Sequence, residues 1–408
     1  MRRGGMDDFD VAVVGGGLVG ASLALALAPT RLRTVLIEGV APGSNAQPSF
    51  DERTTALGNA SRRIFQSLGV WEPIESGAAA IRAIHVSDAG HFGFARLEAR
   101  EHGIEAFGYV AANRLIGTAL WGGLTSARRI ALRLPATLEQ VHIEPERVVL
   151  SLRAAEHAEQ IAARLVVAAD GADSKVRQAA GIEAEVRDYG QVAVVSNVAC
   201  DRPHDGTAFE RFNPAGPMAL LPLRDGTYTA VWARAPAQAE RALALEEREF
   251  LAQLQLHFGW RAGRFLSSGR RAAYPLRLTR ASAAVRSRTV LIGNAAQALH
   301  PVAGQGFNLG LRDAAQLAET LAGASGDPGA PGVLASFAEQ RAVDRRGVVG
   351  FTDGLVRLFG DSRPPVRLAR NLGLLLFDLL PPAKSALARV STGFGGRTPR
   401  LARGLPLA

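Results

Sequence analysis

The chain has 408 residues, of which 47% are hydrophobic, and a formal net charge of +9. This length and apolar content indicate a globular protein of two or three lobes and exclude a disordered chain. Cys200 is the single cysteine, which excludes a disulfide framework and fits a reducing compartment. Most of the positive charge surplus lies after residue 330, where the sequence contains 12 basic and 5 acidic residues. We therefore expect a globular protein with a basic C-terminal part and no nucleic-acid partner.

A glycine-rich turn near the N-terminus carries the first chemical signal. The pattern predicts a strand at 9–14, a turn at 15–20, a helix at 21–28 and a strand at 34–37. In this context Gly15 makes the tight turn, Gly17 admits a pyrophosphate to the helix N-terminus, and Gly20 permits close packing of helix and strand. Glu38 ends the second strand, where it would accept hydrogen bonds from a ribose hydroxyl. The stretch predicts a dinucleotide site, for FAD or for NAD.

The N-terminus superficially resembles a secretory signal, because Arg2 and Arg3 precede an apolar run. However, Asp7, Asp8 and Asp10 interrupt the approach to that run, and glycines break it. The rest of the chain contains no stretch of the ~18 to 20 apolar residues that a membrane span requires. We therefore expect a cytoplasmic protein.

Apolar faces edged with arginine characterise the C-terminal part, at 355–359 and 366–380. Helices of this kind can lie on anionic lipid with their arginines at the headgroups. They can equally pack against the rest of the protein with solvated arginines. The sequence thus leaves open a peripheral contact with the inner face of the membrane.

A second motif follows a strand predicted at 164–169. Its sequence is DGADSKVR, beginning at Asp170 and Gly171. The Gly171 turn would let the backbone approach a ligand, and Ser174 is placed to begin a helix. A plain Asp-Gly turn is the alternative interpretation.

The longest glycine-containing motif, GNAAQALHPVAGQGFNLG, covers residues 293–310. It follows a strand-like run and precedes a helix-like run at 311–318. A loop in this position directs backbone N–H groups at whatever lies above it, which predicts an anion site. Gly304 and Gly306 let a flat ligand approach the main chain, while Pro301 fixes the turn. From these residues alone, an ordinary strand-to-helix loop remains an equal alternative.

Taken together, these motifs resemble those of class A flavoprotein aromatic hydroxylases, in particular the UbiH/UbiF/VisC family of FAD-dependent ubiquinone-biosynthesis hydroxylases. The run 293–310 is similar to the second FAD motif of that family, 170–177 to its DG motif, and 51–71 to its D-x-R-x-x-A-L…L-G-x-W run. Asn294 and Gln297 replace the Asp and His of most relatives, which makes the run similar to the UbiH subgroup. Asn294 brings no charge, although its amide still donates and accepts hydrogen bonds.

The resemblance implies an α/β fold, with a Rossmann-like FAD-binding domain of the p-hydroxybenzoate hydroxylase type, an inserted β-sheet substrate domain and C-terminal helices. The implied FAD-binding domain comprises 1–80, 101–185 and 272–330, the substrate domain 81–100 and 186–271, and the C-terminal helical segment 331–408. Alternating residues predict strands in the substrate domain at 191–199, 208–212, 218–222 and 228–232.

The resemblance also implies which residues hold FAD. They are Gly15, Gly17, Gly20, Glu38, Arg53, Arg114, Asp170, Gly171, Asn294, Gly304, Gln305, Gly306, Phe307 and Asn308. Backbone N–H groups of the last three would stabilise negative charge on the reduced flavin. The absence of a second Gly-x-Gly-x-x-Gly motif indicates that NAD(P)H binds transiently. The histidines lack the spacing of metal ligands, so no metal is expected.

In that family NAD(P)H reduces the flavin, and a C4a-hydroperoxyflavin formed with O2 transfers a hydroxyl group to an electron-rich ring. The resemblance thus implies an FAD-dependent monooxygenase of ubiquinone biosynthesis, acting on a hydrophobic prenylated phenol, at the membrane or in a biosynthetic complex. We expect 4-hydroxylation of 2-polyprenyl-6-methoxyphenol, with His300 and Pro301 as candidate catalytic residues. Hydroxylation at another ring position, or of another aromatic substrate, and a non-catalytic membrane-associated protein with the FAD fold are the alternatives.

Overall fold

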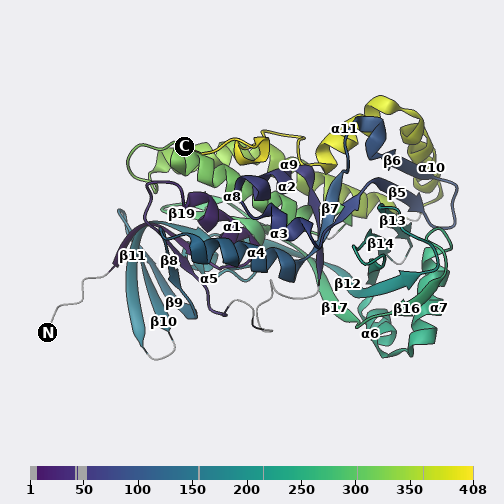
Figure 1. Ribbon diagram of the computed structural model, residues 1–408, viewed down its shortest axis with the longest axis horizontal. Coiled ribbons are helices and arrows are strands. Elements are labelled where there is room, and N and C mark those ends of the chain that lie inside the picture. The colour runs from purple at the N-terminus through teal and green to yellow at the C-terminus, as the bar shows by residue number, and fades with distance from the viewer. Residues whose placement is uncertain are drawn as a thin grey trace.

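The computed structural model describes residues 7–41, 44, 53–154, 157–214, 216–300, 302–361 and 363–407. Their strands form sheets of eight, nine and three strands. Figure 1 shows the eight-stranded sheet with its helices at one end of an elongated molecule and the nine-stranded sheet at the other. The α/β architecture with a second, sheet-based lobe confirms the predicted fold class.

Parallel strands form the centre of the eight-stranded sheet, in the order β19-β11-β1-β2-β8. β18 pairs antiparallel with β19 at one edge, and β10 and β9 extend the sheet from β11 as antiparallel strands. These strands are β1 (Asp7–Val14), β2 (Thr34–Ile37), β8 (Ile130–Arg133), β9 (Ala136–Ile143), β10 (Val148–Ala154), β11 (Ala158–Ala168), β18 (Val285–Arg286) and β19 (Thr289–Leu291). Val11 to Val14 and Thr34 to Ile37 are continuously buried, as expected for parallel strands covered on both faces. The strands predicted at 9–14 and 34–37 are confirmed.

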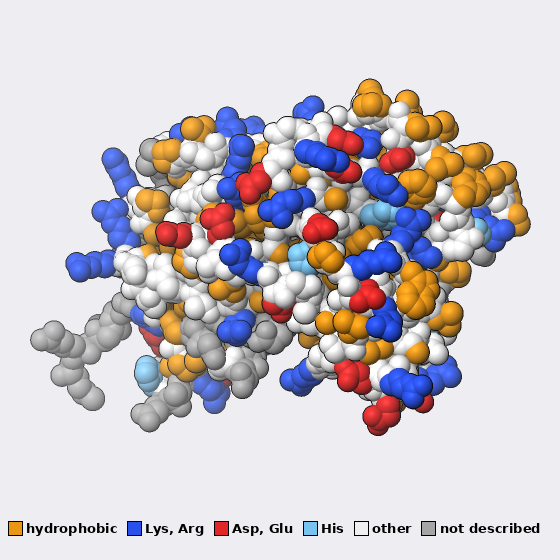
Figure 2. All heavy atoms as spheres, turned by 45° about the vertical axis from the view of Figure 1, so that its right-hand side comes forward, with side chains coloured by type: hydrophobic (Ala, Val, Ile, Leu, Met, Phe, Trp, Pro, Cys, Tyr) orange, Lys and Arg blue, Asp and Glu red, His pale blue; other side chains and the backbone are white. Residues whose placement is uncertain are grey.

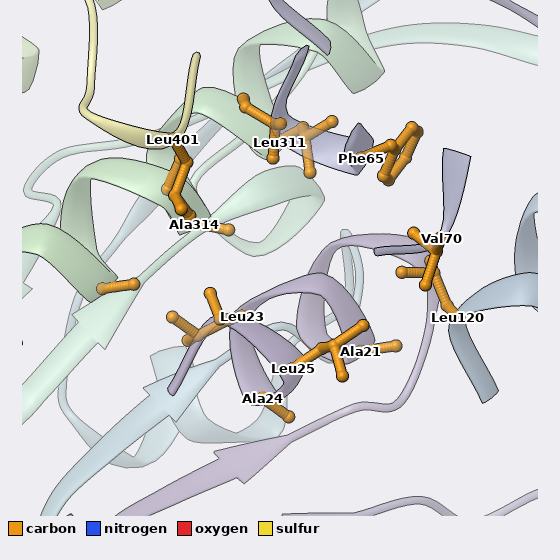
Figure 3. Close-up of a cluster of buried hydrophobic side chains, with 14 of the residues drawn as sticks. Ala21, Leu23, Ala24, Leu25, Phe65, Val70, Leu120, Leu311, Ala314 and Leu401 are labelled. Carbon is orange, nitrogen blue, oxygen red and sulfur yellow. The ribbon is translucent and has the colours of Figure 1, made fainter. Parts of the chain in front are cut away.

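Helices cover this sheet, and a small sheet of β3 (Thr54–Gly58), β7 (Gly108–Ala112) and β4 (Ala79–Ile81) lies beside them. The helices are α1 (Leu18–Leu27), α2 (Asn59–Ser67), α3 (Trp71–Glu75), α4 (Asn113–Ser126), α5 (Lys175–Ala179) and α8 (Gln305–Ala322). Figure 3 shows the core they share: Leu23 and Leu25 of α1 lie among Phe65 of α2, Leu120 of α4 and Leu311 of α8. Helix α1 is buried nearly all round, because the sheet and α8 both pack against it.

The nine-stranded sheet runs β20-β17-β12-β15-β14-β13-β5-β6, with β16 paired to β12. Its strands are β5 (Ala83–Asp88), β6 (Phe94–Glu98), β12 (Ala184–Cys200), β13 (Thr207–Asn213), β14 (Gly216–Pro222), β15 (Tyr228–Arg234), β16 (Phe265–Ser268), β17 (Ala272–Ala281) and β20 (Gln297–Ala298). The four strands predicted for the substrate lobe all lie within these elements. Helices α6 (Pro236–Ala244) and α7 (Glu247–Phe258), which the sequence analysis did not predict, pack against one face.

Strand pairing differs from the predicted division at one point. β17 pairs with β12 over ten residue pairs, so it belongs to the nine-stranded sheet, although 272–281 was assigned to the FAD-binding domain. β12 is 17 residues long and needs a partner along its first half, which β17 provides. The domain boundaries as a whole stay a prediction.

The C-terminal part is helical, as predicted, and contains α9 (Pro331–Gly360), α10 (Pro364–Leu379) and α11 (Pro381–Ser391). Each begins with proline, whose fixed φ and missing N–H suit the first helical turn. A buried Arg370 on α10 donates to the Asp88 carboxylate of β5 at 2.7 Å and fixes the helix to the nine-stranded sheet. Within the described residues, no helix has both the length and the hydropathy to span a bilayer.

A buried network of charges joins α8 to α9. The carboxylate of Asp313 accepts from Arg341 at 2.7 Å and from Arg345 at 3.0 Å, and Asp344 accepts from Arg341 at 2.7 Å and from Arg312 at 2.9 Å. The Asp313 and Arg341 side chains are fully buried. Burial pushes the pKa of Asp313 upward, but Arg345 and Arg341 outweigh it and hold that pKa below its ordinary value. The network therefore stays ionised at neutral pH.

Replacing Asp313 by Asn should lower the free energy of unfolding by about 3–5 kcal/mol, because it removes one of the two carboxylates that bind the buried Arg341 and the carboxylate that binds Arg345. Urea denaturation measures this as a shift in midpoint at unchanged slope. The matched control is Glu139→Gln, which removes the partner of the exposed Arg153 and should cost less than about 1 kcal/mol. Equal losses in both variants would contradict a structural role for the buried network.

Candidate functional site

A large cleft of about 910 Å³ lies between the two large sheets. The carboxyl ends of the parallel strands reach it, through Val14 of β1, Ile37 of β2 and Ala169 after β11. Ligands of open α/β sheets bind in this position, outside the carboxyl ends of the strands. The nine-stranded sheet supplies the opposite wall.

The turn between β1 and α1 depends on close backbone contacts. Gly15 has φ +100°, and a Cβ atom on it would lie 2.4 Å from the Ala169 carbonyl oxygen. A Cβ atom on Gly20 would lie 1.9 Å from the Gly15 oxygen. Gly17 caps α1, so the first turn of that helix presents unpaired N–H groups. Gly15 and Gly17 line the cleft, whereas Gly20 lies behind them and permits the packing.

Glu38 follows β2 and lines the same end of the cleft. Its Oε2 atom accepts from the Gly16 N–H at 2.6 Å and its Oε1 atom from the Val40 N–H at 2.9 Å. The carboxylate is thereby held beside the glycine turn. Contact with a ribose at this position stays a prediction.

The DG motif lies at the end of β11, with Asp170 and Gly171 both lining the cleft. The Ser174 hydroxyl accepts from the Arg177 N–H at 3.0 Å and caps α5, as predicted. Asp170 Oδ2 accepts from the Val176 N–H at 3.3 Å, while its Oδ1 atom is buried without a hydrogen-bond partner among the described residues. Burial raises the pKa of Asp170. An orphaned acceptor facing a cleft fits a ligand that donates a hydrogen bond there.

The motif at 293–310 differs from its predicted form. Helix α8 begins at Gln305, inside the motif, rather than at 311. Gly304 caps it in the left-handed conformation, with φ +60°. Helix α8 needs glycine at position 310, because a Cβ atom there would lie 3.0 Å from the Gly293 Cα atom. Helix α8 therefore begins about two turns earlier than predicted, and its N-terminus lies at the cleft.

Asn294, Gly304, Gly306 and Phe307 line the cleft, while Pro301 lies outside the described residues. Gln305 is buried and Asn308 is 3% exposed, and neither is among the lining residues.

Asn308 connects three segments of the chain. Its Oδ1 atom accepts from the Gly58 N–H at 2.8 Å and from the Ser61 hydroxyl at 2.7 Å. Its Nδ2 atom donates to the carbonyls of Ala56 and Gly304 at 2.8 and 2.7 Å. The side chain therefore positions the start of α8 against β3 and α2. The sequence analysis did not foresee this role, because the partners lie about 250 residues away.

The two predicted arginines occupy different places. Arg53 lines the cleft, and its guanidinium lies 4.8 Å from the centre of the Tyr274 ring. Arg114 is exposed on α4 and is not one of the lining residues. The structure thus brings together most of the predicted cofactor residues, with Gly20, Arg114, Gln305 and Asn308 outside the lining.

His300 lines the cleft but is only 1% exposed. Its Nδ1 atom accepts from the Val302 N–H at 3.2 Å, so the proton lies on Nε2, which is 3.4 Å from the Gln191 Oε1 atom. Burial lowers the pKa of His300 to about 4. The imidazole is therefore neutral at pH 7, and Nδ1 is already engaged. Its catalytic role stays a prediction.

The wall formed by the nine-stranded sheet is almost entirely apolar. It contributes Ala208, Phe209, Glu210, Pro217, Ala219, Leu221, Val231, Ala233 and Ala298 to the cleft. The sequence analysis recognised the strands but did not single out Glu210. Alternation along β13 is the signal that could have identified it, since Glu210 occupies the same face as Ala208.

These residues fit a bound dinucleotide such as FAD. The α1 N-terminus and the glycine turn suit a pyrophosphate, Glu38 and the orphaned Asp170 oxygen suit hydroxyl donors, and the α8 N-terminus suits a second anionic group. No group of three His, Cys, Asp or Glu side chains within the described ranges could hold a metal ion.

Comparisons with known proteins also indicate an FAD-binding protein. The FAD binding domain family matches residues 8–352. Ubiquinone hydroxylase UbiL of Rhodospirillum rubrum is 38% identical over 407 residues, covering 98% of this chain and 93% of its own. The 3-demethoxyubiquinol 3-hydroxylase of Escherichia coli is 32% identical over 375 residues, covering 90% and 94%. The structure of p-nitrophenol 4-monooxygenase PnpA from Pseudomonas putida DLL-E4 shares the fold, with a TM-score of 0.78 at 20% identity over 96% of this chain and all of that one.

Replacing Gly20 by Ala should reduce flavin retention by about tenfold or more, because the added methyl group collides with the Gly15 carbonyl and displaces the turn. The ratio of visible flavin absorbance to protein in the purified variant measures this. Gly122→Ala on α4 is the control, since a Cβ atom there meets nothing within 4 Å. Full flavin content in the Gly20 variant would contradict the assignment of this turn to the cofactor.

Proposed function

We propose that this chain, which belongs to the FAD binding domain family and to the ubiquinone-biosynthesis hydroxylases within it, hydroxylates the ring of a prenylated phenol. It is an FAD-dependent monooxygenase with NAD(P)H as the reducing co-substrate. The most specific form of the proposal is 4-hydroxylation of a 2-polyprenyl-6-methoxyphenol. The GNAAQ sequence, with Asn294 and Gln297, supports the UbiH type. A different ring position is the alternative, because a relative named as a 3-hydroxylase is 32% identical.

The observation that carries the proposal is the contrast between the two walls of the cleft. One wall presents glycine turns, helix N-termini and carboxylates, while the other presents mostly alanine, valine, leucine and proline side chains, together with Phe209 and Glu210. Bound FAD would supply the redox and oxygen chemistry. The chain supplies the rest: Gly15, Gly17 and Glu38 bind and orient the cofactor, and the N–H groups at Gly306 and Phe307 face developing negative charge. The apolar wall excludes water and accepts a hydrophobic ring.

The deciding experiment is an anaerobic titration of the purified flavoprotein with NADPH, with and without a short-chain 2-prenyl-6-methoxyphenol. Flavin bleaching should be much faster with the phenol present, and aerobic turnover should yield the 4-hydroxylated product by mass spectrometry. A product hydroxylated elsewhere on the ring would support the alternative position. Reduction and oxygen consumption without any hydroxylated product from this phenol would overturn the proposed substrate class.

A hydrophobic substrate must reach the enzyme from a membrane, and α10 has an exposed apolar face that suits contact with lipid. Its outward face carries exposed leucines at a spacing of four, four and three residues: Leu368, Leu372, Leu376 and Leu379, which are 56%, 47%, 58% and 75% exposed. Figure 2 shows hydrophobic side chains gathered at the end of the molecule where Figure 1 places α10 and α11. The opposite face of α10 is fixed by the Arg370 contact with Asp88. The leucine face is thus presented outward by a rigid attachment.

We propose that this leucine face rests on an anionic bilayer. Arg363 and Arg367 are exposed at the start of α10, and Arg389 is exposed on α11, so cations flank the apolar stripe. Such an arrangement suits insertion of leucines below anionic headgroups. A prenylated phenol dissolved in the same bilayer would then be close to the enzyme.

Vesicle flotation tests this surface. The double variant Leu372→Glu and Leu376→Glu should bind phosphatidylglycerol-containing vesicles at least about tenfold more weakly, since it removes two leucines that the bilayer would bury. The control is Leu256→Glu with Leu266→Glu, two exposed leucines on α7 and β16, which should bind as wild type does. Equal binding by all three proteins, or oligomer dissociation in the α10 variant, would contradict lipid as the occupant.

A further inference from the structure

One ionisable side chain interrupts the apolar wall of the cleft. Glu210 lies on β13, directly opposite Ala219 of β14, which in turn lies opposite Val231 of β15. On its other side Glu210 lies opposite Val86 of β5. Glu210, Ala219 and Val231 all line the cleft. Glu210 therefore lies in a row with Val86, Ala219 and Val231 across the four strands β5, β13, β14 and β15.

The pleat of β13 places its other charged residue on the far face. Arg211, the next residue along, has its Nη1 atom 3.3 Å from the Ser87 hydroxyl and its Nε atom 3.4 Å from the His257 carbonyl. The cationic cluster that it forms with Arg261 lies outside the cleft. Among the described lining residues that the nine-stranded sheet contributes, Glu210 is therefore the charged one.

The other carboxylates among the described lining residues, Glu38, Asp170 and Asp173, lie in the opposite lobe. Glu38 is held by two backbone N–H groups beside the glycine turn, and Asp170 belongs to the loop that caps α5. His300 accepts from Val302 through Nδ1. A ring lying against the apolar wall therefore meets Glu210 as the carboxylate of that wall.

We propose that Glu210 accepts the hydrogen bond of the phenol hydroxyl of the substrate, an inference that rests on the proposed function. A phenol has an unperturbed pKa of about 10, so it is neutral at pH 7. A hydrogen bond to a carboxylate shifts the O–H bonding electrons toward the ring and enriches the carbons ortho and para to oxygen. Those are the carbons that an electrophilic hydroxyl donor attacks. In the same contact Glu210 fixes which edge of the ring points away from the wall, and so contributes to the choice of ring position.

The test compares two ligands with two proteins, all as FAD-loaded full-length enzyme. The ligands are 2-prenyl-6-methoxyphenol and its O-methyl ether, which lacks the donor. Perturbation of the flavin spectrum gives each dissociation constant. Wild type should prefer the phenol, and Glu210→Leu should lose about tenfold to hundredfold in phenol affinity while its affinity for the ether changes little, because hydrogen bonds to charged groups are strong.

Glu210→Gln separates charge from hydrogen bonding. Its amide oxygen still accepts, so it should restore part of the phenol affinity, while the rate of hydroxylation per reduced flavin stays at least about tenfold below wild type. Glu185→Gln, on exposed β12 of the same sheet and outside the cleft lining, is the matched control.

The outcomes separate this inference from the proposed function. If wild type hydroxylates the phenol but Glu210→Leu binds phenol and ether with unchanged preference, the role of Glu210 is overturned and the function stands. If Glu210→Leu loses affinity for both ligands equally, the residue shapes the wall and does not accept the hydroxyl. If wild type yields no hydroxylated phenol at all, the proposed function fails, and this inference fails with it.

Discussion

The geometry of the molecule depends on one carboxylate that is buried away from water. Asp313, on α8, accepts from Arg341 of α9 and also from the Gln297 side chain at 2.8 Å. Gln297 belongs to β20, which pairs with β17 of the nine-stranded sheet. Arg345, which also binds Asp313, donates to the Leu291 carbonyl at the end of β19. Because a buried charge must keep all of its partners, both walls of the cleft are held in fixed positions relative to α8.

Close backbone contacts then set where α8 begins. Gly310 packs against Gly293, and Asn308 binds backbone and hydroxyl groups of the segment around Gly58. These contacts hold the helix N-terminus against the cleft while the Asp313 network holds the following turn. An anionic group in the cleft thus meets N–H groups that are positioned before it arrives, so little free energy is lost in ordering them.

The sequence predicted those parts of this arrangement that depend on residues close together in the chain. The glycine turn after β1, the serine cap of α5 and the strands of the second lobe follow from spacing and alternation, and the structure has them. The start of α8 was placed too late, because Gly306 and Gly310 read as loop residues, and only the close approach of Gly293 shows that the helix needs glycine at position 310. The pairing of β17 with β12 was not foreseen for a similar reason, since the two strands lie about 80 residues apart in the chain.

The division of polarity across the nine-stranded sheet follows from the period of two along each strand. In β13, Arg211 faces outward, where a hydroxyl and a carbonyl lie within reach, and Glu210 faces the cleft among Ala219, Leu221 and Val231. A wall that served only to exclude water would be complete with another apolar residue at this position. A wall that must also orient a hydroxylated ring needs one acceptor in an apolar surface, because a single strong hydrogen bond then distinguishes one edge of the ring from the others. Glu210 is placed to supply that distinction.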